Sequence, residues 1–233
     1  MSSTIYLIPS VLDEMAINTI PLYIIDAVKD CQVIFAENER TARRFLKSIC
    51  KEIVIDDFEW FTIHKAEEEQ KNNFRQKIKE NKNIAIISEA GCPGIADPGQ
   101  ILIEVAQQMN VTVKPLVGPS SILLALMASG MNGQQFEFVG YLPIDNGERI
   151  KTIKELETTS QKKRSTIIFI ETPYRNNQLI ESLLRTCKPT TKICIAAELT
   201  GSNEFIKTKT VSEWKNEKTD FHKKPVIFLL SCF

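Results

Sequence analysis

The sequence predicts an α/β fold in which a mostly parallel sheet is covered by helices on both sides. Short apolar runs alternate along the chain with segments whose apolar residues recur at helical spacing, and this alternation is typical of parallel sheets. The run Ile84–Ser88 is almost wholly apolar, as expected of a strand that is covered on both faces. The 233 residues can form two small domains, which we place at 1–116 and 117–233 with a ligand cleft between them.

The first half is expected to contain strands joined by helices. Asp97 and Pro98 have the residue types of an N-cap and a first helical position, so they predict the start of a helix that runs through Met109. The expected strands are Ile5–Pro9, Val33–Glu37, Glu52–Ile55, Ile84–Ser88 and Val111–Val117. The other expected helices are Thr19–Lys29, Glu39–Ile49 and Lys65–Asn81.

The second half is expected to begin with a buried helix. Ser120–Ser129 is apolar almost all round, and Gly130 is suited to end it in a left-handed conformation. Gln161–Arg164 is predicted to be a basic loop. The remaining expected helices are Glu148–Glu157 and Tyr174–Thr186, and the expected strands are Phe136–Leu142, Thr166–Glu171, Lys192–Leu199, Ile206–Val211 and Val226–Ser231.

Composition and charge exclude several classes of protein. Basic and acidic residues number 29 each, so the net charge of zero gives no general attraction to nucleic acid or membrane. The longest apolar run, Ile122–Ala128, is far shorter than a membrane span, and the N-terminus lacks the pattern of a signal peptide, so we expect a cytoplasmic protein. The six cysteines are scattered, which fits reduced thiols. His64 and His222 are the only histidines, so no metal site or Ser/His triad is expected.

The loop Ser88–Gly99 is the strongest indication of a bound ligand. It carries three glycines and two prolines directly after an apolar strand, whereas a plain connection needs only a few residues. It matches neither a Walker loop nor the Gly-x-Gly-x-x-Gly fingerprint. Ligands of open α/β sheets bind beyond the carboxyl ends of the strands, so we interpret this loop as part of a small-molecule site.

Three further segments allow both a functional and a purely structural interpretation. Gly118–Ser121 offers backbone and hydroxyl donors to a ligand, or forms an ordinary helix start. Glu171–Arg175 ends a strand and contains groups suited to acid–base work or a substrate clamp, although Thr172 and Pro173 alone would form a good helix cap. A basic stripe at helical spacing would touch phosphates or form a solvated helix face; it consists of Arg40, Arg43, Arg44 and Lys47.

These segments occur together, in order, in one known family. The loops at 88–99 and 118–121, the strand at 136–143, Glu171–Arg175 and Ala197–Thr200 follow one another as they do in the tetrapyrrole methylase superfamily, the class III S-adenosylmethionine methyltransferases. Within that superfamily the chain resembles most the branch that methylates a ribose 2′-hydroxyl in small-subunit ribosomal RNA. The combination covers most of the chain and is specific, although no single segment is.

The resemblance implies a fold, a cofactor and a set of site residues. Two α/β domains, the second with a mixed sheet, would hold S-adenosylmethionine in the cleft between them, in a homodimer that acts on RNA without a metal. Methyl transfer to a hydroxyl needs a base or a substrate clamp, for which Glu37, Glu171 and Arg175 are the candidates. The residues implied to bind the cofactor are Glu89, Ala90, Gly91, Cys92, Pro93, Ile95, Gly118, Pro119, Ser120, Ser121, Thr172 and Ala197.

The sequence also departs from the family pattern where substrate is expected to bind. Ile8–Glu14 contains no glycine, although the family usually has Thr-Pro-Ile-Gly-Asn there. Glu37-Asn38-Glu39-Arg40 replaces Glu-Asp-Thr-Arg, and Glu89 replaces an aspartate. Two alternatives to RNA ribose methylation therefore stay open: methylation of a tetrapyrrole, and a non-catalytic relative that keeps the cofactor site.

Overall fold

The computed structural model describes residues 3–63 and 67–233. The chain divides into two compact units, Met1–Ser120 and Ser121–Phe233, which we call unit 1 and unit 2. Each unit has one five-stranded sheet and its own hydrophobic core.

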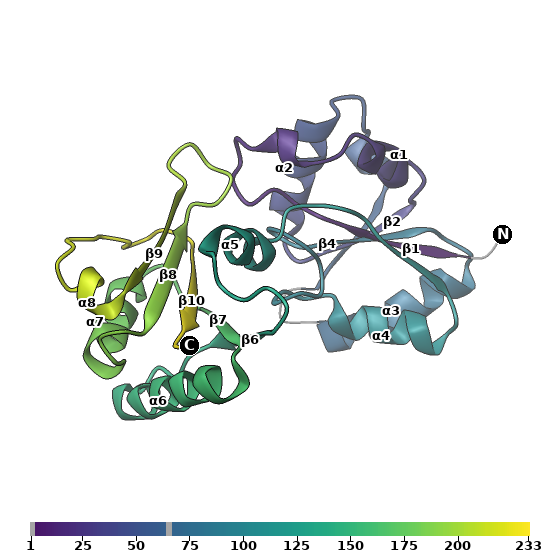
Figure 1. Cartoon of the computed structure of the whole chain (residues 1–233). Coiled ribbons are helices and arrows are strands. Elements are labelled where there is room, and N and C mark those ends of the chain that lie inside the picture. Colours follow the sequence, from purple (N-terminus) through teal and green to yellow (C-terminus); the bar gives the residue numbers. More distant parts are fainter. Residues whose placement is uncertain (1–2, 64–66) are drawn as a thin grey trace. The chain divides into compact units, whose positions relative to one another are not determined.

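The sheet of unit 1 is parallel throughout, as predicted. Its strand order is β3-β2-β4-β1-β5 (Figure 1). The central strand β4 pairs with β1 through Ile84 and Ile5 and with β2 through Ile84 and Val33, and all its residues are buried. The strands are β1 (Thr4–Ile8), β2 (Val33–Ala36), β3 (Glu59–Thr62), β4 (Ile84–Ile87) and β5 (Thr112–Pro115).

Two pairs of helices cover the two faces of this sheet (Figure 1). Helices α1 (Tyr23–Lys29) and α2 (Glu39–Ile49) pack on one face, and α3 (Glu67–Lys79) and α4 (Gln100–Gln108) pack on the other. Asn38 caps α2, because its side-chain oxygen accepts a hydrogen bond from Arg40 N at 3.0 Å. The bounds of α2 agree with the sequence prediction. His64, and Lys65 at the start of the helix predicted over Lys65–Asn81, lie outside the described residues.

Two elements of unit 1 differ from the prediction. The helix expected over Thr19–Lys29 begins only at Tyr23, because Pro21 disfavours helical backbone at the residue before it, and Ile20 is extended. No strand forms at Glu52–Ile55; the chain instead makes a short 3-10 turn and then enters β3. Strand β3 is at the edge of the sheet and its side chains are only partly buried, so its sequence lacks the apolar run of an inner strand.

The sheet of unit 2 is mixed, as predicted. Its order is β6-β7-β10-β8-β9; β6 and β7 are parallel, and the other neighbours are antiparallel. The strands are β6 (Phe136–Tyr141), β7 (Thr166–Ile170), β8 (Lys192–Ala197), β9 (Phe205–Thr210) and β10 (Val226–Ser231).

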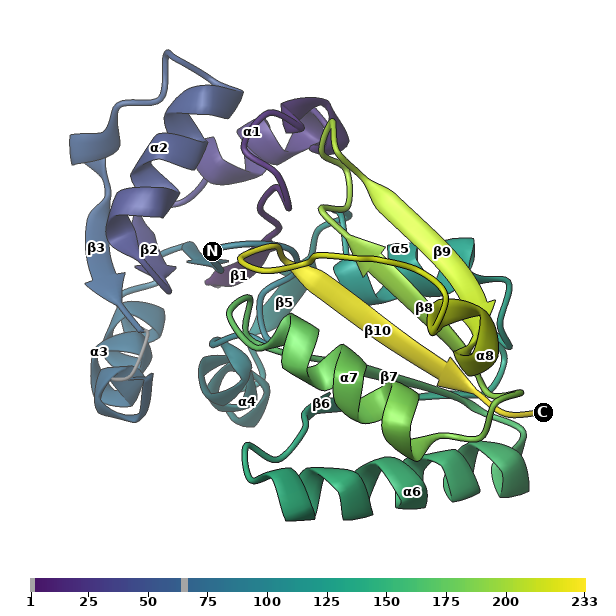
Figure 2. The same ribbon diagram turned by 90° about the vertical axis from the view of Figure 1, so that its left-hand side faces the viewer.

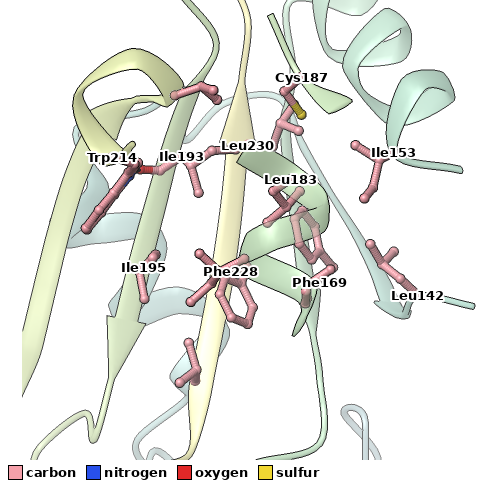
Figure 3. Close-up of a cluster of buried hydrophobic side chains, with 14 of the residues drawn as sticks. Leu142, Ile153, Phe169, Leu183, Cys187, Ile193, Ile195, Trp214, Phe228 and Leu230 are labelled. Atoms are coloured by element: carbon pink, nitrogen blue, oxygen red, sulfur yellow. Dashed lines mark hydrogen bonds between the residues drawn. The ribbon is translucent and has the colours of Figure 1, made fainter. Parts of the chain in front are cut away.

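One face of this sheet packs against α6 (Asn146–Lys163) and α7 (Asn176–Thr186), which lie side by side (Figure 2). The core between them contains Phe169, Phe228 and Leu183 (Figure 3). The short helix α8 (Val211–Trp214) closes one side of this core, and Trp214 Nε1 donates a hydrogen bond to Ile193 O at 2.8 Å. Helix α5 (Ser121–Ser129) contacts β9 and β10.

Three predictions for unit 2 need correction. Helix α5 is buried on one face only, since Leu123 and Met127 are 50% and 79% exposed. Gln161–Arg164 is not a loop but the last turn of α6, which Arg164 ends in a left-handed conformation with φ of 53°. Helix α7 begins at Asn176 instead of Tyr174, because the chain first makes a turn in which Arg175 N donates to Thr172 O.

The sequence predictions also concern the cysteines, membrane-spanning helices and metal sites. All six cysteines are free thiols. Within the described ranges, no helix combines the length and the apolar character that crossing a membrane requires. Among residues 3–63 and 67–233, no group of three or more potential ligands is arranged to hold a metal ion.

Candidate functional site

The carboxyl edge of the unit 1 sheet gathers the segments that the sequence singled out. Because the strands are parallel, the segments that follow β1, β2, β4 and β5 all leave from one edge. Ser10, after β1, exchanges two backbone hydrogen bonds with Gly91, of 2.8 and 3.1 Å. Its hydroxyl also donates to Ser88 O at 2.8 Å. The segment after β1, which lacks the usual glycine, therefore anchors the loop 88–99.

The second predicted loop lies against the first within unit 1. Cys92 Sγ is 3.5 Å from Pro119 O, to which it donates. Gly118 approaches Pro9 so closely that an added Cβ would lie 2.2 Å from Pro9 Cβ. No real side chain tolerates that distance, so only glycine fits at position 118. Ser121, the last residue of this motif, belongs to unit 2 as the first residue of α5.

Three carboxyl groups come together at this edge. Glu37 follows β2 and is buried, and its Oε2 accepts a hydrogen bond from Glu89 N at 2.8 Å. Thr41 Oγ1 lies 3.3 Å from Glu89 Oε1, to which it donates. Asp97 is half-buried, and burial together with the charges of Glu37 and Glu89 raises its pKa to about 7. This edge therefore holds Asp97 in an environment that favours its protonated form.

Sequence reasoning missed the place of Asp97 in this group. The pair Asp97-Pro98 was interpreted as a helix start, but α4 begins at Gln100, with Gly99 in the N-cap position. The backbone N–H groups at the start of α4 are bound instead by Glu67, from the first turn of α3. The position of Asp97 inside the glycine- and proline-rich loop was the available signal for a role at the site.

A mainly apolar hollow of about 450 Å³ borders the same loop. Its volume is in the range of small-molecule sites. Cys92, Pro93 and Ile95 line it, whereas Glu89 and Ala90 do not. The three carboxyl groups border the same loop as the hollow, although they are not among its lining residues. The other lining residues are Leu7, Gly94, Gln100, Ile103, Glu104, Pro115 and Leu116.

The basic stripe on α2 is largely engaged with neighbouring groups. Arg43 pairs with Glu39 at 2.7 Å and lies over the Trp60 ring, and Arg44 pairs with Glu14 at 2.6 Å. These contacts favour the interpretation as a solvated helix face. Arg40 differs: it is exposed, and its side chain has no hydrogen bond or ion pair with another described residue.

In unit 2, the predicted catalytic pair forms a compact ion pair at the end of β7. Glu171 Oε1 accepts hydrogen bonds from Thr172 N at 2.6 Å and from Arg175 Nε and Nη2 at 3.0 and 2.6 Å. The Glu171 side chain is 1% exposed, and its Oε2 is buried without a partner in the described part of the chain. The positive charge of Arg175 thus compensates the negative charge of Glu171.

Register brings Ala197 to the same edge as Glu171. Ile227 of β10 pairs with Ile170 on one side and with Ala196 on the other, so β7 and β8 end level with each other. Thr172 begins the turn that precedes α7 and does not cap that helix. Glu198, after β8, is paired with Lys224 at 2.6 Å. The predicted residues that follow β7 and end β8 therefore lie along one sheet edge, whereas Ser121 is on α5.

Comparison with known proteins gives relatives over most of the chain. A family model described as Tetrapyrrole (Corrin/Porphyrin) Methylases matches residues 18–215. A Bacillus subtilis (strain 168) protein named Ribosomal RNA small subunit methyltransferase I is 31% identical over 217 residues, which cover 91% of this chain and 70% of the relative. A protein of the same name from Buchnera aphidicola subsp. Acyrthosiphon pisum is 29% identical over 234 residues, which cover 98% of this chain and 79% of the relative.

Solved structures share the fold at much lower identity. The methyltransferase CobJ superposes with a TM-score of 0.66 at 14% identity, covering 99% of this chain and 94% of its own. Diphthine synthase superposes with a TM-score of 0.69 at 13% identity, covering 99% of this chain and 90% of its own. Because the family model spans most of the sequence and the Bacillus relative is 31% identical over 91% of it, this chain is a methyltransferase of the tetrapyrrole methylase family.

Proposed function

We propose that this protein uses S-adenosylmethionine to methylate a ribose hydroxyl of small-subunit ribosomal RNA. The observation that carries the proposal is the edge of unit 1, where an apolar hollow and three carboxyl groups border one glycine-rich loop. The relatives named Ribosomal RNA small subunit methyltransferase I supply the substrate class. Their similarity extends over the sequence segments that form this edge.

The residues of unit 1 fit S-adenosylmethionine by their chemistry. When bound, this molecule supplies a methyl group on a positively charged sulfur. The apolar walls formed by Cys92, Pro93 and Ile95 suit the nucleoside, and the carboxylates of Glu37 and Glu89 favour the positive charge. We assign the loop 88–95 and the segment 118–120 to donor binding. In unit 2, we assign Ser121, Thr172 and Ala197 to the same ligand.

Asp97 is the group that we assign to the proton of the ribose hydroxyl. A hydroxyl that gains a methyl group must lose a proton, and a base with a pKa near the working pH accepts it most effectively. The pKa of Asp97 is about 7, because burial and the neighbouring carboxylates disfavour its charged form. Glu171 is less suited to this task, since Arg175 already binds its carboxylate. We assign Glu171 and Arg175 to fixing the turn after β7.

Two measurements on the purified protein test the proposal. Isothermal titration calorimetry with S-adenosylmethionine is expected to show binding. Transfer of a radiolabelled methyl group is expected to small ribosomal subunits isolated from a strain that lacks the gene, and not to subunits from the parent strain. Nuclease digestion and mass spectrometry of the labelled RNA then locate the methyl group on ribose or base.

The outcomes separate the possible functions. Donor binding without transfer to RNA would favour a non-catalytic relative, and transfer to a tetrapyrrole acceptor in place of RNA would favour the tetrapyrrole branch. Absence of donor binding would contradict the proposal at its base.

We also propose that the protein is a homodimer and that it works in the cytoplasm, where ribosomal subunits are available to it. The exposed Leu123 and Met127 of α5 give an apolar surface that a second copy of the chain would cover. Light scattering is expected to give twice the mass of 26.5 kDa for the wild type. Met127→Lys is expected to lower that mass, and a wild-type monomer at micromolar concentration would contradict the proposal.

A further inference from the structure

The start of α4 is capped by a carboxylate from another helix. Glu67 Oε1 accepts hydrogen bonds from the backbone N–H groups of Gly99, Ile101 and Leu102 at 3.0, 2.8 and 3.2 Å. These N–H groups have no partner within the helix, since the first turn of an α-helix leaves its donors free. One oxygen atom from α3 thus satisfies the beginning of α4, 32 residues away from Gly99 in the sequence.

This cap is located where the candidate donor loop ends. Gly99 closes the loop 88–99 with φ of 124°, and Gly94 N donates to Pro98 O at 3.2 Å within the same turn. Gly94 is itself tightly placed, because an added Cβ would lie 2.9 Å from Ile103 Cδ1 on α4. The path of the loop therefore depends on where α4 begins, and Glu67 fixes that point.

We propose that Glu67 is a positioning residue that holds the donor loop in its binding shape and closes the α4 N-terminus to anions. The proposal rests on the proposed function, since it takes the loop 88–99 to bind S-adenosylmethionine. The N-terminus of a helix after a glycine-rich loop is an ordinary seat for phosphate groups. Here the carboxylate of Glu67 occupies that seat, so the loop favours a donor without phosphates over a nucleotide.

Three variants separate positioning from general stability. Glu67→Ala removes the acceptor, Glu67→Gln keeps a neutral one, and Glu69→Ala changes an exposed carboxylate two residues along α3. Calorimetry is expected to show S-adenosylmethionine binding about tenfold weaker for Glu67→Ala, intermediate for Glu67→Gln and unchanged for Glu69→Ala. Hydrogen exchange at the amides of Gly99, Ile101 and Leu102 is expected to be about tenfold faster in Glu67→Ala than in the wild type.

The response to added acetate is the most specific test of the cap formed by Glu67. In Glu67→Ala, added acetate should occupy the vacated N-terminus, slow the exchange of these three amides and recover part of the donor affinity. A purely structural defect elsewhere would not respond to a small carboxylate. Unchanged exchange at the three amides in Glu67→Ala, or wild-type donor affinity despite faster exchange, would overturn the proposal. If the wild type binds no S-adenosylmethionine, the proposed function fails and so does the donor-binding role of Glu67, while the exchange rates still report whether Glu67 holds the loop.

Discussion

In both units, carboxyl groups lie just beyond the ends of sheet strands, but the charged groups around them differ. At the edge of unit 1, burial together with the charges of Glu37 and Glu89 raises the pKa of Asp97 to about 7. At the edge of unit 2, Glu171 is bound by Arg175 and Glu198 by Lys224. At the first edge the neighbouring carboxylates help to disfavour the charged form of Asp97, whereas at the second each carboxylate is bound by a basic side chain. The comparison shows that the side chains around a carboxyl group decide whether its pKa rises or its position is fixed by an ion pair.

The largest expected effect concerns the compensated edge. Arg175→Met leaves the buried Glu171 carboxylate without its partner, so we expect a loss of about 3 kcal/mol in the free energy of unfolding. Urea denaturation measures this loss. Arg185→Met, on the exposed pair of the same helix, is expected to cost less than about 0.5 kcal/mol. Equal losses for the two variants would show that the buried ion pair of Arg175 and Glu171 stabilises the fold no more than an exposed pair does.

The next effect tests the close approach of Gly118 to Pro9, in the segment after β1. Gly118→Ala places a Cβ where Pro9 already is, so we expect a loss of about 2 kcal/mol and weaker S-adenosylmethionine binding. Gly133→Ala is the control, because nothing lies within 4 Å of its added Cβ. Thermal unfolding and calorimetry measure the two effects. A Gly118→Ala variant as stable as Gly133→Ala would show that the segment after β1 moves away from position 118 at little cost.

A smaller effect sharpens the electrostatic side of the comparison. The pKa of Asp97 is about 7 in the folded chain and 3.8 for the free side chain, so the folded state holds its proton more tightly. This contribution to stability is fully present below pH 4 and is lost as the pH rises through 7. Asp97→Asn should remove this dependence and exceed the wild type in stability at pH 8 by on the order of 1 kcal/mol, after allowance for solvent screening.

Urea denaturation from pH 4 to pH 8 measures this difference. The gain of Asp97→Asn over the wild type should shrink steadily as the pH falls toward 4. A gain that does not change with pH would show that the charge of Asp97 is not strained in the folded state. Asp57→Asn is the control, since Asp57 is exposed in the short 3-10 turn before β3.

The smallest effect concerns Arg40, an exposed cation at the start of α2. Arg40→Ala should leave stability within about 0.5 kcal/mol of the wild type. It should weaken ribosomal RNA binding by roughly threefold and lower the salt dependence of the affinity by about one counterion. Lys151→Ala is the control, since Lys151 is 80% exposed on α6 and paired with Glu155. Equal salt dependence for both variants would show that Arg40 does not approach a phosphate.

Local patterns predicted most of the fold. The apolar run at Ile84–Ile87, the amphipathic helix Glu39–Ile49 and the alternation of strands and helices each depend on neighbours within one element. The glycines and prolines of 88–99 likewise marked the candidate loop, while its assignment to the donor remains a prediction. Two of the wrong predictions fell where distant neighbours matter: strand β3 is half-covered at a sheet edge, and α6 packs against α7 and β10 over its length. The late starts of α1 and α7 instead have local causes, Pro21 and the turn at Thr172.

By itself, the sequence determined the alternation of strands and helices, the parallel sheet of the first half and the position of the loops along the chain, because hydrophobic periodicity and turn chemistry are written in consecutive residues. The mixed sheet of the second half was expected only from the family resemblance. Only the tertiary structure decided that Asp97 joins Glu37 and Glu89, that Glu67 caps α4 and that Glu171 is neutralised by Arg175. Electrostatic fields depend on distances in space, and carboxyl groups from separate strands and helices approach one another only when the sheet is assembled.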